Sequence, residues 1–411
     1  MHFFLQSIRS LARYRPEWRF MVIGSIAFPQ LCDIQLANVD LIYWDDDRFA
    51  KNLFSWGKFV AKQFNKEMDA GFLIQSRLEA VGINWGNRER VQKALSECDL
   101  IWVPFYNIGL KNLALAELLR RISRPVIATV HDIHPSFYPE DYSPDLLINY
   151  QQGFIPFVKN CVKVFTHSDF QKKAIVQHLN LDAAKIYVTP QPPLNDPEVF
   201  SCAAQKNIGQ KILAKFQIES PFVFYPASTL HAHKNHFRLI LAWKELKEKL
   251  RDQCPRLVCT SKGSSAQWKR IQALINHFQL GDTIIFTGSI DFTALAVLFG
   301  ACDLVVLPTL FEGAGSGILT DACIHGKPVI SSSIPQIQEQ VTALGGLDVG
   351  YFDGYSIPSI VETVSTYLAH KDGLSGKALR NQSILTDNFH ILWDNWSRAY
   401  TEVFHDVAKN F

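Results

Sequence analysis

The segment Phe311–Asp321, FEGAGSGILTD, combines residue types that can hold a ligand rich in hydroxyl groups. It follows an apolar run, so we expect a strand, a glycine-rich turn and then a helix that begins near Gly317. Glu312 opens this turn, and Asp321 falls in the first turns of the helix. Because glycine permits positive φ and close approach, the backbone amides of the turn are free to face a ligand. The residues that offer those amides are Gly313, Ala314, Gly315, Ser316 and Gly317.

Lys234 is the second residue with an evident chemical use. It lies in HAHKNH, directly before an amphipathic helix expected over 236–250, whose apolar residues fall at 4-3-4 spacing. A lysine at the N-terminus of a helix adds a point charge to the exposed amides. The combination suits a diphosphate group.

Three histidines surround this lysine in an HxHxxH pattern that could bind zinc: His231, His233 and His236. This one short stretch supplies no fourth ligand, and the lysine stands among the histidines. The sequence therefore predicts no metal site here.

Short apolar runs alternate with helical stretches along most of the chain. Strands that are apolar throughout and separated by helices are typical of parallel sheets covered on both faces, so we predict the α/β class. Helices are expected over 111–123, 169–178 and 236–250. The expected strands are 19–24, 99–104, 125–130, 162–167, 222–226, 256–260, 283–288, 303–308 and 328–332.

A proline-rich segment divides the chain in two. At 411 residues the chain is long for one hydrophobic core. PQPPLNDPEVF has four prolines in eight residues and no helix or strand periodicity, so we interpret 190–200 as a linker. We expect an N-terminal domain over 1–189, a second domain over 201–385, and a C-terminal helix over 386–411 that crosses back. Because ligands bind beyond the carboxyl ends of parallel strands, the site should lie in a cleft between the domains.

The composition excludes several classes of protein. With 41 basic and 39 acidic residues the net charge is +2, without the basic excess of a nucleic-acid-binding protein. The eight cysteines include no CxxC pair and mostly adjoin apolar residues, which indicates reduced core cysteines in a cytoplasmic protein. No apolar run approaches the roughly 18 residues that span a bilayer. Four arginines near the start suit peripheral contact with the inner membrane, although a solvated helix face explains them equally well: Arg9, Arg13, Arg15 and Arg19.

The second half resembles the nucleotide-binding domain of GT-B glycosyltransferases, and in particular the retaining family that includes mannosyl- and glucosyltransferases (glycosyltransferase family 4). The stretches that carry the resemblance there are 225–240 and 284–332. In the first half they are TVHDIHPSFYPED and VFTHSDFQKKAI, and KIYVTPQPP resembles the connector between the domains. The resemblance implies the GT-B fold, with two Rossmann-like domains that face each other across a cleft.

The resemblance also implies roles for single residues. Glu312 matches the acidic residue that contacts the transferred sugar, and Lys234 matches the lysine that neutralises the diphosphate. His131 matches a first-domain histidine that leans over the sugar. Asp321 stands where the family has a glutamate on the ribose, after a turn that is one residue longer than usual.

Three further donor-binding positions follow from the same resemblance. Ser289 and Ile290 match the turn that holds the base. Ser228 stands six positions before Lys234, where the family usually has an arginine. This departure would leave the diphosphate with weaker neutralisation or with help from His231 or His233.

The implied function is retaining transfer of a hexose from a GDP- or UDP-linked donor to a hydroxyl of a glycan or lipid-linked acceptor. The resemblance implies no metal and no other cofactor. Two alternatives stay open, namely a GT-B sugar-nucleotide epimerase and a degenerate, non-catalytic GT-B protein. Asp45, Asp46 and Asp47 suggest the metal-binding DxD motif of the GT-A fold, but they are better interpreted as an acidic helix start.

The beginning of the chain departs from the family pattern. Phe4, Ile8 and Leu11 indicate a helix at once, without the strand and glycine-rich turn that usually open a GT-B first domain. We expect this strand to be missing, through a late start, a truncation or replacement by another element.

Overall fold

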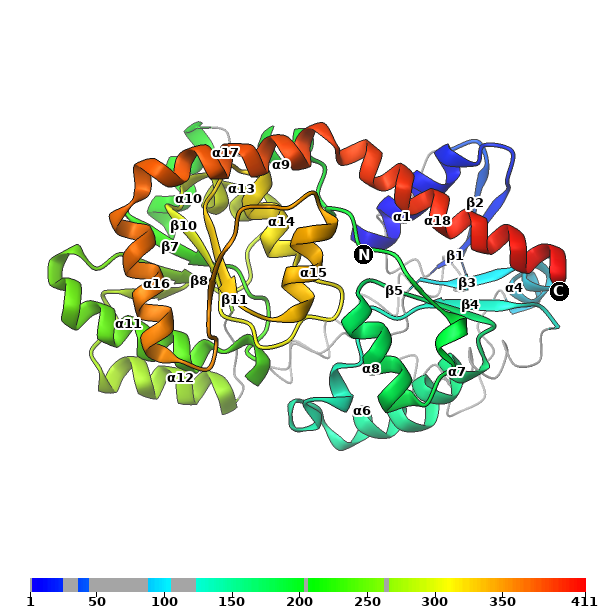
Figure 1. The fold of residues 1–411 in the computed structure, drawn as a ribbon, viewed down its shortest axis with the longest axis horizontal. Helices are drawn as coiled ribbons and strands as arrows, with labels where there is room; N and C mark the ends of the chain where they lie inside the picture. The colour runs from blue at the N-terminus through cyan, green and yellow to red at the C-terminus, as the bar shows by residue number, and fades with distance from the viewer. Residues whose placement is uncertain (1, 25–35, 44–87, 105–122, 203–205, 262–265) are drawn as a thin grey trace, which may run out of the picture.

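The computed structural model describes residues 2–24, 36–43, 88–104, 123–202, 206–261 and 266–411. Within these ranges the chain forms two α/β domains that lie side by side (Figure 1). The expected α/β class is confirmed. The aspartates at 45–47 and most of the helix expected over 111–123 lie outside the described residues.

The C-terminal domain is built on a six-stranded parallel sheet in the order β12-β11-β10-β7-β8-β9. The first strand of the domain, β7, therefore lies beside the fourth, β10, and the strand order reverses between them. Such a reversal is the point at which open parallel sheets bind ligands. The strands are β7 (Phe222–Tyr225), β8 (Arg256–Cys259), β9 (Ile284–Phe286), β10 (Leu304–Leu307), β11 (Val329–Ser332) and β12 (Gly350–Phe352).

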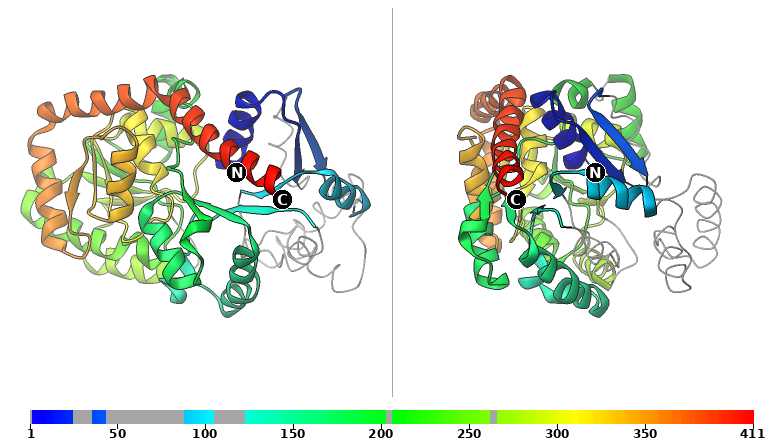
Figure 2. Two further views of the ribbon diagram at one scale, coloured as in Figure 1. Left: turned by 45° about the vertical axis from the view of Figure 1, so that its right-hand side comes forward. Right: turned by 90° about the vertical axis from the view of Figure 1, so that its right-hand side faces the viewer.

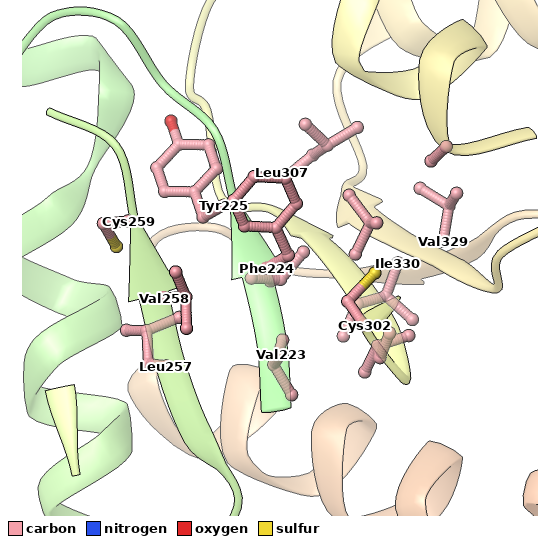
Figure 3. Close-up of a cluster of buried hydrophobic side chains, with 14 of the residues drawn as sticks. Val223, Phe224, Tyr225, Leu257, Val258, Cys259, Cys302, Leu307, Val329 and Ile330 are labelled. Atoms are coloured by element: carbon pink, nitrogen blue, oxygen red, sulfur yellow. The ribbon is translucent and has the colours of Figure 1, made fainter. Parts of the chain in front are cut away.

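Helices cover this sheet and bury its apolar strands. Every residue of β7, β10 and β11 is buried, and Figure 3 shows their side chains packed with those of β8. Leu239, Trp243 and Leu246 of α11 are fully buried, as their spacing predicts. The helices are α10 (Lys206–Lys215), α11 (His236–Leu250), α12 (Ala266–His277), α13 (Phe292–Ala301), α14 (Gly317–Ile324), α15 (Pro335–Ala343), α16 (Ile357–Ala369) and α17 (Lys371–Asp387), with 3-10 turns η6 (Ala232–Lys234) and η7 (Arg251–Gln253).

The N-terminal domain holds a four-stranded parallel sheet and a separate parallel pair. The sheet has the order β3-β4-β5-β6, and β1 pairs with β2. The strands are β1 (Phe20–Gly24), β2 (Val39–Tyr43), β3 (Ile101–Val103), β4 (Val126–Thr129), β5 (Lys163–Thr166) and β6 (Ile186–Val188). The helical elements are α1 (His2–Tyr14), α4 (Arg88–Glu97), η2 (His134–Ser136), η3 (Pro139–Asp141), α6 (Pro144–Asn149), the π-helical turn η4 (Tyr150–Phe154), α7 (Ile155–Asn160), α8 (Asp169–Leu179) and η5 (Ala183–Lys185).

The last helix, α18 (Phe389–Asn410), follows α17 and lies against the N-terminal domain (Figures 1 and 2). Tyr400 stacks on Phe165 of β5, with ring centroids 3.7 Å apart. Its hydroxyl shares a hydrogen bond of 3.1 Å with Thr129 of β4. Ser397 and Ser10 of α1 share a hydrogen bond of 2.6 Å. The end of the chain is therefore part of the core of the first domain.

All nine expected strands are present, and the expected helices that lie among the described residues are present too. Three short strands escaped the sequence analysis, namely β2, β6 and β12. The segment 190–200, which shows no helix periodicity in its sequence, ends in the first turn of α9 (Pro197–Cys202). Proline is tolerated in the first turn of a helix, where its missing N–H has no helical partner to lose. Among the described residues, no helix is long and apolar enough to cross a membrane.

Candidate active site

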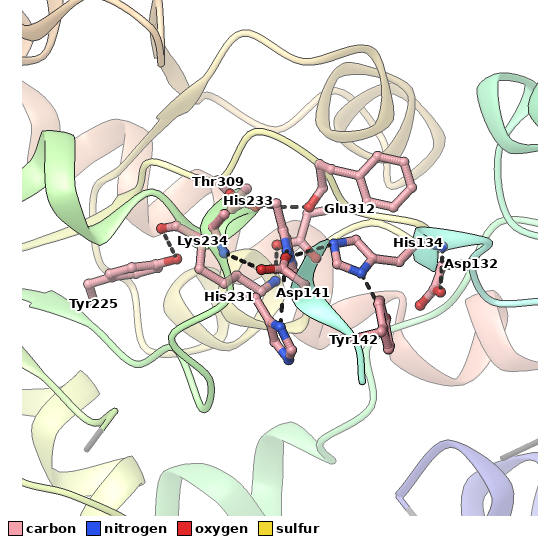
Figure 4. Close-up of polar contacts among 12 residues, drawn as sticks. Asp132, His134, Asp141, Tyr142, Tyr225, His231, His233, Lys234, Thr309 and Glu312 are labelled. Atoms are coloured by element: carbon pink, nitrogen blue, oxygen red, sulfur yellow. Dashed lines mark hydrogen bonds and ion pairs between the residues drawn. The ribbon is translucent and has the colours of Figure 1, made fainter. Parts of the chain in front are cut away.

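Lys234 and Glu312 meet at the point where the strand order of the C-terminal sheet reverses. Lys234 follows β7 and Glu312 follows β10, and these two strands are neighbours. The Nζ of Lys234 donates to Oε1 of Glu312 over 2.6 Å (Figure 4). Both side chains are largely buried, with exposed fractions of 18% and 14%. Sequence positions 78 residues apart thus form one charged pair at the ligand-binding end of the sheet.

Buried hydrogen bonds fix the backbone that carries Lys234. The hydroxyl of Tyr225 donates to the carbonyl of Lys234 over 2.9 Å. The next residue, Asn235, adopts the left-handed conformation with φ of 59° and stands directly before α11. Its side-chain amide donates to the carbonyls of Pro308 and Gly354 over 2.9 and 2.7 Å. The lysine is therefore tied both to its own strand and to the end of β10.

The glycine-rich turn touches the N-terminal domain directly. A Cβ atom on Gly313 would overlap the main-chain oxygen of His131 and the Cβ of Asp132. Only glycine allows this approach of the two domains. His131 and Asp132 follow β4, so the carboxyl ends of β4 and β10 face each other here.

The rest of the turn is shaped by α15. Gly315 has φ of +84°, which disfavours any other residue type. Gln340 accepts from the N–H of Ser316 over 2.7 Å and donates to its carbonyl over 3.1 Å. Helix α14 then begins at Gly317, and the first amides of a helix have no partner within it. Ala314 lies in the same turn and is half-buried.

The ring of His131 contacts residues of the first domain. Its Nε2 lies 2.9 Å from the carbonyl oxygen of Pro104, and its Nδ1 lies 3.0 Å from Nε2 of His167. Phe3 of α1 packs edge-on against the ring. Burial lowers the pKa of His131 to about 4 and that of His167 to about 3, so both imidazoles are neutral at pH 7. The part of His131 that meets the glycine turn is its carbonyl; its role over the sugar stays a prediction.

Asp321 lies under the interdomain linker. Its Oδ1 accepts from the side-chain amide of Asn195 over 2.8 Å. Burial raises its pKa to about 7, although the hydrogen bond from Asn195 opposes this shift. The structure thus gives Asp321 a contact with the linker, and its ribose contact stays a prediction. The other donor positions lie at loop ends, with Ser228 and Ser289 exposed and Ile290 packed at the edge of the core.

Two residues at the domain boundary are not evident from the sequence. Asp141 of η3 and His134 of η2 lie beside His231 and His233 of the C-terminal domain (Figure 4). The N–H of Ala232 donates to Oδ1 of Asp141 over 3.0 Å. Both missed residues stand in HDIHPSFYPED, the segment after β4 in which only His131 had been singled out.

The chain is similar to known proteins in both sequence and fold. Residues 210–371 match the family model described as "Glycosyl transferases group 1". Over nearly the whole chain the fold is similar to that of a glycosyltransferase from Rickettsia africae, with a TM-score of 0.62, 14% identity, and coverage of 99% of this chain and 95% of that one. It is also similar to Anabaena HepE in complex with UDP-glucose, with a TM-score of 0.66, 16% identity, and coverage of 98% and 95%.

The chain has the GT-B fold, and part of its C-terminal domain is similar to group 1 glycosyl transferases. The GT-B fold with two Rossmann-like domains expected from the sequence is confirmed. Among curated proteins, O-antigen chain mannosyltransferase RfbU of Salmonella typhimurium is 25% identical over 236 residues, which are 57% of this chain and 60% of RfbU. Serotype-specific mannosyltransferase WbdA of Escherichia coli is 23% identical over 218 residues, which are 52% of this chain and 26% of WbdA. The similarity therefore covers less than two thirds of either relative.

Proposed function

We propose that this GT-B protein is a retaining glycosyltransferase that moves a hexose from a nucleotide sugar to a hydroxyl group of a glycan or lipid-linked acceptor. The observation that carries the proposal is the Lys234–Glu312 pair at the switch point of the C-terminal sheet. Beside it lie the turn at Gly313 and the first amides of α14, which together offer a cation, a carboxylate and N–H donors to one ligand.

In the proposed reaction the acceptor oxygen bonds to the anomeric carbon while the bond between that carbon and the phosphate oxygen breaks. The leaving diphosphate takes the proton of the acceptor hydroxyl, on the same face of the sugar. Lys234 and the amides of α14 stabilise the negative charge that develops on the diphosphate. Glu312 binds hydroxyls of the sugar and holds the lysine in place, so these residues act by position and charge.

The donor and acceptor are proposed from the relatives. RfbU and WbdA are named as mannosyltransferases, which favours mannose, and HepE has been solved with UDP-glucose. GDP and UDP donors both remain within the proposal, and the acceptor class follows from the O-antigen named for RfbU. A lipid-linked acceptor would bring the protein to a membrane surface from the cytoplasm. The transfer itself is proposed to need no metal.

The test is a thermal-shift screen of nucleotides and sugar nucleotides, followed by transfer assays with Glu312→Gln and Lys234→Met. We expect one base to raise the unfolding temperature by several degrees. We expect either substitution to lower transfer by about 100-fold, the usual effect of removing one transition-state donor. Glu248→Gln and Lys244→Met are matched controls, because this lysine–glutamate pair lies 2.8 Å apart on the surface of α11.

Two other outcomes would replace the proposal. Isomerisation of the donor without transfer would identify an epimerase. The absence of any shift with every nucleotide, together with no turnover in the wild type, would identify a non-catalytic GT-B protein.

A further inference from the structure

A group of imidazole rings gathers around one carboxylate oxygen at the boundary between the domains. Oδ2 of Asp141 lies 3.4 Å from Nδ1 of His233, 3.7 Å from Nε2 of His134 and 3.7 Å from Nδ1 of His231 (Figure 4). The donor atoms of His134, Asp141 and His233 all lie within 4.8 Å of one another. We call these four residues the His–Asp cluster.

Hydrogen bonding accounts for only one contact of the cluster, that between His233 and Asp141. Two of the three nitrogen–oxygen distances exceed the range of a hydrogen bond, and the third lies at its upper limit. Nε2 of His134 is buried and has no hydrogen-bond partner among the described residues. A buried nitrogen aimed at a carboxylate beyond bonding distance is a costly arrangement unless something else binds it.

The spacing is that of ligands around a small cation. In a tetrahedral zinc site with bonds of about 2.0–2.2 Å, neighbouring donor atoms lie about 3.3–3.6 Å apart. The distance from Asp141 to His233, 3.4 Å, lies in this range, and the distances to His134 and His231, both 3.7 Å, lie just above it. Imidazole nitrogens with one carboxylate oxygen suit Zn²⁺ better than Ca²⁺ or Mg²⁺, which prefer oxygen ligands.

The surrounding groups hold these donors as outer contacts hold metal ligands. Nδ1 of His134 lies 2.7 Å from the hydroxyl of Tyr142, which orients the ring and leaves Nε2 for the cluster. Oδ1 of Asp141 accepts from the N–H of Ala232, so Oδ2 is the oxygen that faces the histidines. The nearby cation, Lys234, is neutralised by Glu312.

We propose that the His–Asp cluster binds one zinc-type divalent transition-metal ion through His134, Asp141 and His233, with His231 or a water as the fourth ligand. His134 and Asp141 belong to the N-terminal domain, whereas His231 and His233 belong to the C-terminal domain. The ion therefore clamps the domains together and fixes the loop that carries Lys234. It takes no part in the sugar transfer, whose independence of metal is a separate expectation.

On its own, the HxHxxH stretch supplies too few ligands for zinc. The structure brings the missing ligands from the other domain. His236 is not one of them, because its Nε2 lies 3.4 Å from the hydroxyl of Ser261, away from the cluster.

The test uses the full chain, stripped of metal with a chelator and titrated with Zn²⁺ against a chromophoric competitor in the absence of any sugar nucleotide. We expect one Zn²⁺ per chain, bound at least about 100-fold more weakly by Asp141→Asn and by His233→Gln. Each variant removes a ligand from a different domain, and asparagine can still accept from Ala232. His277→Gln, at an exposed histidine of α12, is the matched control and should bind like the wild type.

Co²⁺ absorption provides the second measurement. Tetrahedral nitrogen and oxygen ligands should give strong visible bands without thiolate charge transfer, while zinc should raise the unfolding temperature of the wild type and not of Asp141→Asn. Thiolate bands, binding unaltered in both variants, or no stoichiometric ion in the wild type would overturn the proposal. Since no sugar nucleotide is present in this experiment, its result is independent of the test for glycosyltransferase activity.

Discussion

At the scale of single residues, the contact at Gly313 makes the sharpest demand on sequence. The main chain of His131 and the Cβ of Asp132 occupy the space where a side chain would begin. Gly313→Ala should push the domains apart and lower sugar transfer by about 100-fold, since displacements near 1 Å reduce catalysis on that order. The unfolding temperature should change little, because the overlap lies between domains and can be relieved by opening.

Gly281→Ala is the control for this substitution. Nothing lies within 4 Å of a Cβ built on Gly281, so its transfer rate should equal that of the wild type. Kinetic assays with a nucleotide sugar and calorimetry on both variants check the prediction. Full transfer activity in Gly313→Ala would show that this approach of the domains is not needed.

Asp321 gives a prediction about pH. Burial raises its pKa from 3.8 to about 7, so between these values the folded chain binds a proton that the unfolded chain has released. The free energy of unfolding therefore falls as the pH rises from 4 to 7, by up to about 4 kcal/mol for a shift of about three units. Asp321→Asn should remove this loss and be more stable than the wild type at pH 8.

Urea unfolding between pH 4 and 8 measures this difference. The two proteins should converge near pH 4, where the aspartate is protonated in the folded state, and diverge towards pH 8. Asp394→Asn, at an exposed position of α18, should follow the wild type throughout. Parallel curves for wild type and Asp321→Asn would mean that the buried carboxylate is stabilised by groups other than Asn195.

Some residues of this boundary between the domains could be predicted from the sequence, and others could not. Lys234 and Glu312 could be predicted as site residues because each follows an apolar strand, and polar residues at strand ends gather at one edge of a parallel sheet. Asp141 could not be predicted as a site residue, because nothing in the sequence around it shows that Ala232 and His233 of the other domain pack against it. Such contacts depend on how two domains dock, which periodicity and local propensity do not encode.

At the scale of elements, α15 acts on the first domain through Glu339. Its carboxylate accepts from the N–H of Asp169 over 2.7 Å and from that of Phe170 over 3.1 Å, at the start of α8. A negative charge at the N-terminus of a helix contributes about 0.3–1 kcal/mol at the surface and more when partly buried. This interaction holds the two domains together at a second point, in addition to the contact at Gly313.

Glu339→Gln should weaken this interaction between the domains, because the side-chain amide keeps one acceptor oxygen but loses the negative charge. We expect the apparent affinity for the nucleotide sugar to fall about three- to tenfold, in proportion to the loss of the docked arrangement. Hydrogen exchange read by mass spectrometry should become faster at the first amides of α8. Glu362→Gln, at an exposed position of α16, should change neither the apparent affinity nor the exchange rate. Unchanged hydrogen exchange in Glu339→Gln would show that Glu339 does not hold the two domains together.

Most helices and strands could be predicted from the sequence, and the exceptions have physical causes. The strands of the C-terminal sheet are buried on both faces, so they appear as continuous apolar runs. β12 begins with a glycine, and β6 lies directly before the proline-rich linker, so neither stands out as a separate apolar run. The helix that begins at Pro197 was hidden by the prolines around it, which obscure a first helical turn.

At the scale of the whole molecule, α18 makes the two domains interdependent. It continues from α17 on the C-terminal domain and buries a row of aromatic side chains against the first domain. Trp393 also donates to the carbonyl of Pro193 in the linker over 3.0 Å. Phe311 of the second domain and Phe137 of the first pack with ring centroids 4.8 Å apart, which adds apolar contact across the boundary. The wild type should therefore unfold in one calorimetric transition although it has two cores.

Tyr400→Ala should break this coupling. Tyr400 is fully buried between Phe165 and Trp396, and removing a large aromatic side chain from a core costs about 3–5 kcal/mol. The loss falls on the N-terminal domain alone, because the ring contacts β5 and its hydroxyl contacts β4. Scanning calorimetry should then resolve an early transition of the first domain from a later transition near the wild-type temperature. Leu379→Ala, at an exposed position of α17, should leave a single peak. A single peak in Tyr400→Ala as well would mean that contacts at the domain boundary, rather than α18, couple the two cores.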